Sequence, residues 1–205
     1  GEGDFLPFDL WESLIDPAHP VLEPYSEQEV FIGLDLALSP GGDDCALVGV
    51  YHDEGKVKLA FHRVWRGRDR KRKLKLAETV IPFLEGIGQR YQVAGIWIDP
   101  WQASLLADTL WGMGFMVEEV PQTHATRGPK DTALLHLIDN HELVLYDHPQ
   151  VRTMALGANA KELGNGMIFL QKGAGRHKID LLVALANVAN EAADLSKQGP
   201  AVILL

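Results

Sequence analysis

The chain has 205 residues and a net charge of −9, from 28 acidic and 19 basic side chains, which by itself argues against a nucleic-acid-binding protein. Hydrophobic residues make up 46% of the sequence, enough for a core, and the single cysteine excludes an intrachain disulfide and a four-cysteine zinc site. No apolar run approaches the roughly 20 residues that a membrane span needs, so we expect no membrane partner.

The two ends of the chain differ from its middle in composition. Residues 1–29 are rich in Pro, Asp and Glu and predict a linker or N-terminal extension with one short helix near Trp11. Residues 30–195 hold the periodic apolar segments and predict a single domain, which residues 196–205 follow as a tail that is apolar at its end. The sequence begins without methionine, so we expect a piece of a longer or processed protein.

The first half of the predicted domain reads mainly as strands. Residues 30–38 form an apolar run that predicts a buried strand. Residues 45–53 and 56–65 predict two further strands joined by a hairpin turn. Helical spacing over 75–91 predicts a helix, and Pro82 within it is expected to shift its start or bend it.

The second half alternates strand and helix patterns. In chain order we expect a strand over 93–99, a helix over 101–115, a strand over 116–121, a helix over 128–143, a short extended piece and a helix within 144–163, a two-stranded hairpin over 166–178 and a closing helix over 179–195. Because the first strands pair antiparallel and the later ones alternate with helices, the predicted fold class is α/β, a mixed sheet with helices on both faces.

Three acids interrupt or border apolar runs, where carboxylates are rare: Asp35 inside the first strand, Asp99 at the end of a later strand, and Asp180 at the start of the last helix. If these elements pack together, the carboxylates repel one another unless they are protonated or bind a metal. Oxygen ligands suit Mg²⁺ or Mn²⁺, and one or two such ions would activate water at a phosphodiester. Two acids have a structural alternative: Asp99 before Pro100 fits a helix N-cap, and Asp180 fits the first turn of its helix.

A basic run lies against the negative balance of the chain. Eight of the 19 basic residues fall between Arg63 and Lys75, with one acid among them. Such a cluster can neutralise DNA phosphates locally, although a solvated loop and helix start explains it equally well. The candidate DNA-binding residues in this run are Arg66, Arg68, Arg70, Lys71 and Arg72.

Three segments, "FIGLDLALSPGGDDCALV", "IWIDPWQASLLADTLWGMGF" and "HKIDLLVALANVANEA", together resemble the C-terminal nuclease domain of tailed-bacteriophage terminase large subunits. The resemblance runs in order from about Val30 to Ala193, which is most of the chain. It implies an RNase H-like fold and a metal-dependent DNA endonuclease that cuts concatemeric viral DNA during genome packaging by two-metal-ion phosphodiester hydrolysis.

The resemblance also implies roles for individual acids. Asp35, Asp99 and Asp180 match the catalytic acids that bind the metal ions, with Asp35 expected to contact both ions. Leu181 stands where some relatives carry a second acid, so the chain lacks a carboxylate that would strengthen the second metal site. Asp44 is a further carboxylate near Asp35 in sequence, and we leave it as a candidate outer group of the site.

By the same resemblance, the predicted hairpin before the last helix overhangs the site and gates DNA entry. This would bring Lys172, Arg176 and Lys178 to the phosphates and His177 near the scissile group, although an exposed loop histidine is the simpler interpretation of His177. We expect Trp101 to pack beneath the site as part of the core.

The partners implied are double-stranded DNA, a terminase ATPase domain in the full-length chain, the small terminase subunit and the portal, in the host cell cytoplasm. No GxxxxGK[ST] phosphate loop occurs in the sequence, so the ATPase is not expected within it.

Three other hypotheses remain at this point. A non-catalytic DNA- or portal-binding module would use the basic run and the apolar tail. An actin-like sugar kinase would explain "GLDLALS", but such kinases need two domains and a second glycine-rich turn. Zinc binding is disfavoured because His136 and His141 are five residues apart and no HExxH motif occurs.

Overall fold

The computed structural model describes residues 2–67, 69, 71–175 and 177–195. Its main feature is a six-stranded sheet in the order β6-β5-β2-β3-β4-β7. The strands are β2 (Glu29–Asp35), β3 (Cys45–Asp53), β4 (Lys56–Trp65), β5 (Gln92–Ile98), β6 (Val117–Glu119) and β7 (Leu143–Val144). The strands β2, β3 and β4 pair antiparallel, whereas β5, β6 and β7 each join in parallel.

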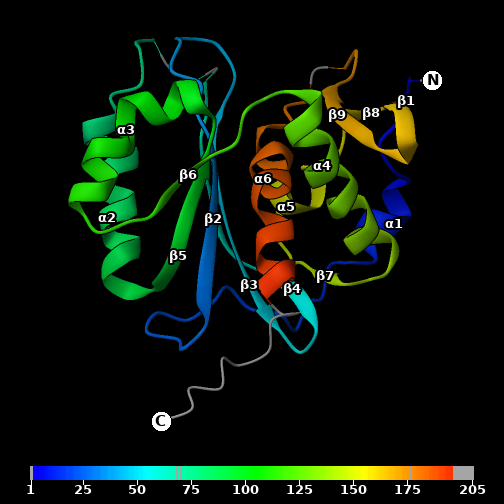
Figure 1. Cartoon of the computed structure of the whole chain (residues 1–205), viewed down its shortest axis with the longest axis horizontal. Helices are drawn as coiled ribbons and strands as arrows, with labels where there is room; N and C mark the ends of the chain where they lie inside the picture. The colour runs from blue at the N-terminus through cyan, green and yellow to red at the C-terminus, as the bar shows by residue number, and fades with distance from the viewer. Residues whose placement is uncertain (1, 68, 70, 176, 196–205) are drawn as a thin grey trace.

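Helices cover both faces of this sheet, as predicted. Figure 1 shows α2 (Val80–Arg90) and α3 (Pro100–Gly112) on one side, and α4 (His124–Asp139) and α6 (Asp180–Leu195) on the other. Each face has its own buried apolar cluster, because successive side chains of a strand point to opposite faces. The prediction of a mixed α/β sheet is therefore confirmed.

The helix α6 lies unusually close to β2 because Gly33 has no side chain. A Cβ atom at Gly33 would lie 2.0 Å from the carbonyl oxygen of Ala184. The four residues from Ala184 back to Asp180 span about 6 Å of helix, and the two residues from Gly33 to Asp35 span about the same length of strand. The close contact therefore brings the two acids to the same level at the end of the sheet.

The predicted helix over 75–91 is present in two parts. A 3₁₀ turn occupies Leu76–Glu78, and α2 then begins at Val80. Pro82 falls in the first turn of α2, where its missing N–H is tolerated. The helix α4 begins at His124, four residues before the predicted start, so Pro129 lies inside it rather than near its first turn.

Two predictions for residues 144–178 are wrong. The expected extended piece and helix within 144–163 are β7 and α5 (Pro149–Thr153), but the helix ends early and β8 (Ala158–Glu162) follows where its continuation was predicted. The hairpin joins β8 to β9 (Ile168–Lys172) across a Gly164–Gly166 turn, so 166–178 contributes one strand of it and not both. Pairing with β9 overrides the helix-favouring composition of β8.

The N-terminal segment packs on the domain instead of lying apart from it. The short strand β1 (Glu2–Asp4) adds to β8 and completes a three-stranded second sheet. The expected helix near Trp11 is α1 (Phe8–Glu12), and the Trp11 side chain is buried with its Nε1 donating to the carbonyl oxygen of Val151. In the ranges described above, every helix is too short or too polar to cross a lipid bilayer.

Candidate metal and nuclease site

Three elements meet at one end of the main sheet. The strands β2 and β5 are parallel neighbours in which Leu34 is paired with Ile98. Asp35 follows Leu34 as the last residue of β2, and Asp99 directly follows Ile98 at the end of β5. Both carboxylates therefore lie at the same edge of the sheet. The N-terminus of α6 brings Asp180 to this edge from the opposite face (Figure 1). This is the end of an α/β sheet where ligand sites commonly lie.

Asp99 is the N-cap of α3, the structural alternative that the sequence left open. Its Oδ1 accepts hydrogen bonds from the backbone N–H groups of Trp101 at 2.9 Å and Gln102 at 3.3 Å. Pro100 occupies the first helical position, where it fixes the direction in which the chain leaves the strand. Capping uses one oxygen of Asp99, and the second remains for another ligand.

Gln102 connects the capped helix to Asp35. Its amide nitrogen donates to Oδ1 of Asp35 at 3.3 Å and to the carbonyl oxygen of Leu36 at 2.8 Å. Its amide oxygen accepts from the backbone N–H of Leu36 at 2.9 Å. Gln102 therefore holds the strand end and orients the carboxylate of Asp35.

The carboxyl group of Asp180 is buried and only partly satisfied. Its Oδ2 has no hydrogen-bond partner among the described residues. Burial, followed by the charges of Asp35, Asp43 and Asp44, raises the pKa of Asp180 from 3.8 to about 7, against a lowering contribution from the backbone N–H of Asp44. An orphaned carboxylate oxygen of this kind is where a bound cation would be stabilising.

Asp35 is also partly buried. Burial raises its pKa from 3.8 to about 6, and the charges of Asp43 and Asp99 contribute in the same direction. The hydrogen bond from Gln102 and the positive charge of Arg127 oppose this rise. Both central carboxyls are thus held in surroundings that disfavour two uncompensated negative charges.

Arg127 supplies a fixed positive charge beside the site. Its side chain is buried, stacks over the ring of Phe169 and forms an ion pair with Asp131 at 3.0 Å. It also donates to the carbonyl oxygen of Leu170 in β9 at 3.4 Å. Because these contacts keep the guanidinium in place, Arg127 offsets part of the charge of Asp35 permanently.

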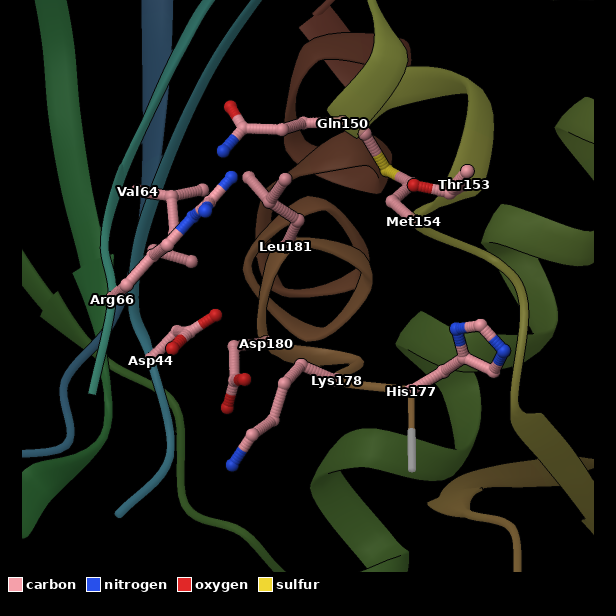
Figure 2. Close-up of a pocket in the computed structure, with 11 residues that line it drawn as sticks. Asp44, Val64, Arg66, Gln150, Thr153, Met154, His177, Lys178, Asp180 and Leu181 are labelled. Carbon is pink, nitrogen blue, oxygen red and sulfur yellow. The ribbon is translucent and has the colours of Figure 1, made fainter. Parts of the chain in front are cut away.

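A pocket of about 280 Å³ opens next to Asp180. Figure 2 shows Asp44, Asp180 and Lys178 next to one another at one side of it. Arg66 lies on the same side of the pocket as Asp44, and His177 lies on the opposite side. The pocket therefore combines acidic and basic groups, as a site for a metal ion and a phosphate requires.

These residues fit a divalent cation in donor type and charge. The carboxylates of Asp35 and Asp180 supply oxygen ligands, the Oδ2 of Asp180 is orphaned, and no described cation pairs with it. Across the described ranges, no group of three or more His, Cys, Asp or Glu side chains is arranged to hold a metal ion as it stands. In this structure Asp99 uses its Oδ1 atom in the helix cap.

Two of the lysines predicted to bind DNA are held by one acid of the β2–β3 loop. Lys178 donates to Asp43 at 2.6 Å, and Lys172 lies 3.3 Å from the same oxygen. Lys178 also donates to the carbonyl oxygen of Gly42 at 3.2 Å. The segment between β9 and α6 is thus tied to the β2–β3 loop across the site.

The basic run is partly described. Lys71 and Arg72 are exposed on the loop between β4 and α2, and Arg66 lines the pocket beside Asp180. The remaining predicted DNA-binding residues, Arg68, Arg70 and Arg176, lie outside the described residues.

Sequence reasoning missed three contributors to the site and misplaced one residue. Gln102 stands three residues after the cap, a spacing typical of capping boxes, but its side chain turns to Asp35 instead of back to the cap. No sequence signal indicated Arg127 or Asp43. The prediction that Trp101 belongs to the core is wrong, because its side chain is 79% exposed.

The sheet order, the helices on both faces and the acids at the strand ends define an α/β protein with an RNase H-like fold. Its structural neighbours are large terminase nuclease domains. The HK97 bacteriophage large terminase aligns with a TM-score of 0.75 and 20% identity, over 94% of this chain and 44% of the other. The large terminase nuclease from the thermophilic phage G20c aligns with a TM-score of 0.68 and 17% identity, over 90% and 96%.

One neighbour contains a metal ion. It is the G20c nuclease with bound magnesium, with a TM-score of 0.68 and 16% identity over 90% of this chain and 96% of the other. The chain thus spans almost all of an isolated terminase nuclease and less than half of the HK97 large terminase. No protein-family profile matches the sequence, and no curated protein matches it. At these identities the likeness shows the fold.

Proposed function

We propose that this chain is a metal-dependent DNA endonuclease that hydrolyses phosphodiester bonds with Mg²⁺ or Mn²⁺. The observation that carries the proposal is the pair of partly buried carboxylates, Asp35 and Asp180, with a buried, orphaned oxygen on Asp180. Asp35 ends β2 and Asp180 begins α6, in a fold shared with terminase nucleases, one of which is described with bound magnesium.

In this proposal Asp35 and Asp180 hold the cation, and Asp99 completes the acidic set through the oxygen that the cap leaves available. The ion, when bound, lowers the pKa of water and neutralises charge on the phosphate. Gln102 fixes the orientation of Asp35, and the backbone N–H of Asp44 fixes that of Asp180. This preorganisation reduces the movement needed when the substrate binds.

Positive side chains supply the phosphate contacts. Arg66 and Lys178 lie in the pocket beside Asp180, within reach of a phosphate seated there. Lys71 and Arg72 extend the basic surface along the loop that follows β4. These charges give local attraction for DNA in a chain whose net charge is −9.

The wider role proposed is the cutting of concatemeric viral DNA during genome packaging in the host cytoplasm. It rests on the neighbours, which include large terminases, one of them, from a thermophilic bacteriophage, in complex with ADP. The expected partners are a terminase ATPase domain, the small terminase subunit and the portal.

A nicking assay on supercoiled plasmid tests the proposal. The wild-type protein should cut in Mn²⁺ or Mg²⁺ and not in EDTA. The variants Asp35→Asn and Asp180→Asn should each lose at least about 100-fold in rate, because each removes a ligand of the ion that stabilises the transition state. Full activity of both variants would contradict the assignment. DNA binding without cleavage under either metal would favour the non-catalytic binding module instead.

A further inference from the structure

Trp101 is an exposed aromatic residue at the edge of the proposed catalytic site. It lies in the first turn of α3, and 79% of its surface is accessible to solvent. Its backbone N–H donates to Asp99 at 2.9 Å, and the next residue, Gln102, contacts Asp35. The backbone of Trp101 is therefore fixed beside Asp99, and the next residue of the helix contacts Asp35.

Nothing in the packing of α3 requires a tryptophan here. The helix buries Ala103, Leu106 and Leu110 against the sheet, and Trp101 lies away from that row. Tryptophan is enriched at binding surfaces because its indole combines a large apolar surface with a polar N–H group. Because the cap fixes the first turn of α3, no loop has to become ordered before Trp101 can contact a binding partner.

The surroundings of Trp101 favour DNA as what it contacts. The exposed loop residues Lys71 and Arg72 belong to the same end of the sheet, since Leu74, just beyond them, donates to the carbonyl oxygen of Leu38 after β2. Figure 1 shows the start of α3 and this loop at the same end of the molecule. A duplex whose phosphate reached Asp35 would lie along this edge.

We propose that Trp101 is a DNA-contacting residue, which packs its indole against the sugar and base of a nucleotide flanking the phosphate that is cut. This deepens the proposed nuclease function and rests on it. Aromatic side chains stack on bases with little regard to sequence, and apolar side chains also enter the minor groove of duplex DNA. The contact would thus hold DNA in register without selecting a sequence.

The same helix offers a matched control. Trp111 is also exposed, at 64%, but lies about 15 Å farther along α3, away from the acids. If α3 served instead as a docking face for another protein, Trp101 and Trp111 would act together and DNA binding would depend on neither.

The test is equilibrium binding of a fluorescent DNA duplex, measured by anisotropy at several salt concentrations in Ca²⁺, an oxygen-liganded ion used in place of Mg²⁺. Trp101→Ala should weaken binding about tenfold. The dependence of log K on log salt should keep its wild-type slope, because an apolar contact releases no counterions. Trp101→Phe should retain most of the affinity, and Trp111→Ala should bind as the wild type does.

Wild-type affinity in Trp101→Ala would overturn the inference, as would equal decreases in affinity in the Trp101 and Trp111 variants. Because Trp101 is exposed, thermal unfolding of Trp101→Ala should match the wild type, which distinguishes weaker DNA binding from unfolding of the protein. Failure of the wild-type protein itself to bind DNA would contradict the proposed function, and this inference with it.

Discussion

The substitution Asp180→Asn should stabilise the metal-free protein while removing its function. The pKa of Asp180 rises from 3.8 to about 7 in the folded state, chiefly because of burial and the nearby charge of Asp35. At about 1.4 kcal/mol per pKa unit, ionising this group at pH 8 costs the folded protein about 4 kcal/mol. The introduced amide has an NH₂ group without a hydrogen-bond partner, which costs about 1–2 kcal/mol. The expected net increase in the free energy of unfolding at pH 8 is therefore about 2 kcal/mol.

The pH dependence of this gain follows from the direction of the pKa change. Below about pH 4 the Asp180 carboxyl is protonated in both the folded and the unfolded protein and costs nothing. As the pH rises from about 4 to 7, the unfolded state ionises first, so the wild-type protein loses stability across this window and not above it. Because the cost of the introduced amide remains at every pH, Asp180→Asn should be about 1 kcal/mol less stable than the wild type at pH 4 and about 2 kcal/mol more stable at pH 8.

Urea unfolding of the wild type and the variant in EDTA at pH 4 and pH 8 measures the effect. Asp108→Asn, an exposed acid on α3, is the matched control and should change stability by no more than about 0.5 kcal/mol. Saturating Mn²⁺, at about 100 times its dissociation constant, should stabilise the wild type by about 2.7 kcal/mol and the Asp180→Asn variant by much less. A variant less stable than the wild type at pH 8 would refute the reasoning about the buried charge.

Three further predictions concern other parts of the structure. Gly33→Ala places a Cβ atom 2.0 Å from the carbonyl oxygen of Ala184, so it should lower the free energy of unfolding by at least about 2 kcal/mol. Because the added atom displaces α6, cleavage should also decrease. An unchanged urea midpoint would contradict the close packing of helix and strand. Replacing Lys71 and Arg72 together by alanine should weaken DNA binding. The slope of log K against log salt should decrease by about 2, one for each phosphate that is no longer neutralised. An unchanged slope would mean that the basic loop is only solvated. Asp43→Asn releases Lys172 and Lys178, which pair with Asp43, so DNA binding should tighten and should depend more steeply on salt. Weaker binding would instead mean that those ion pairs position the lysines for DNA.

The acids could be found from the sequence because carboxylates inside apolar runs need a compensating partner. Asp35 and Asp180 interrupt or border such runs, and the alternation of strands and helices predicted a mixed sheet covered by helices on both faces. Their convergence depends on Gly33, whose missing side chain lets α6 approach, and a lone glycine in a strand does not indicate such a contact.

Other features depend on contacts between distant segments. Residues 158–162 have a helix-favouring composition but pair as β8 with β9, a partner that local propensity cannot show. The helix α3 has apolar residues on every side, so periodicity could not tell that Trp101 faces solvent. Asp43 follows a glycine-rich turn, and its ion pairs with Lys172 and Lys178 arise only in the folded chain.

The most direct test of the central claim is anomalous diffraction from a crystal soaked in Mn²⁺. The proposed site predicts a manganese peak between Asp35 and Asp180, with carboxylate oxygens at about 2.1 Å, a distance typical of small octahedral cations. The Oδ2 atom of Asp180, which has no hydrogen-bond partner among the described residues, should be one of the ligands. A well-ordered site without a peak at these carboxylates, under conditions in which the protein cleaves DNA, would contradict the claim that they hold the catalytic metal.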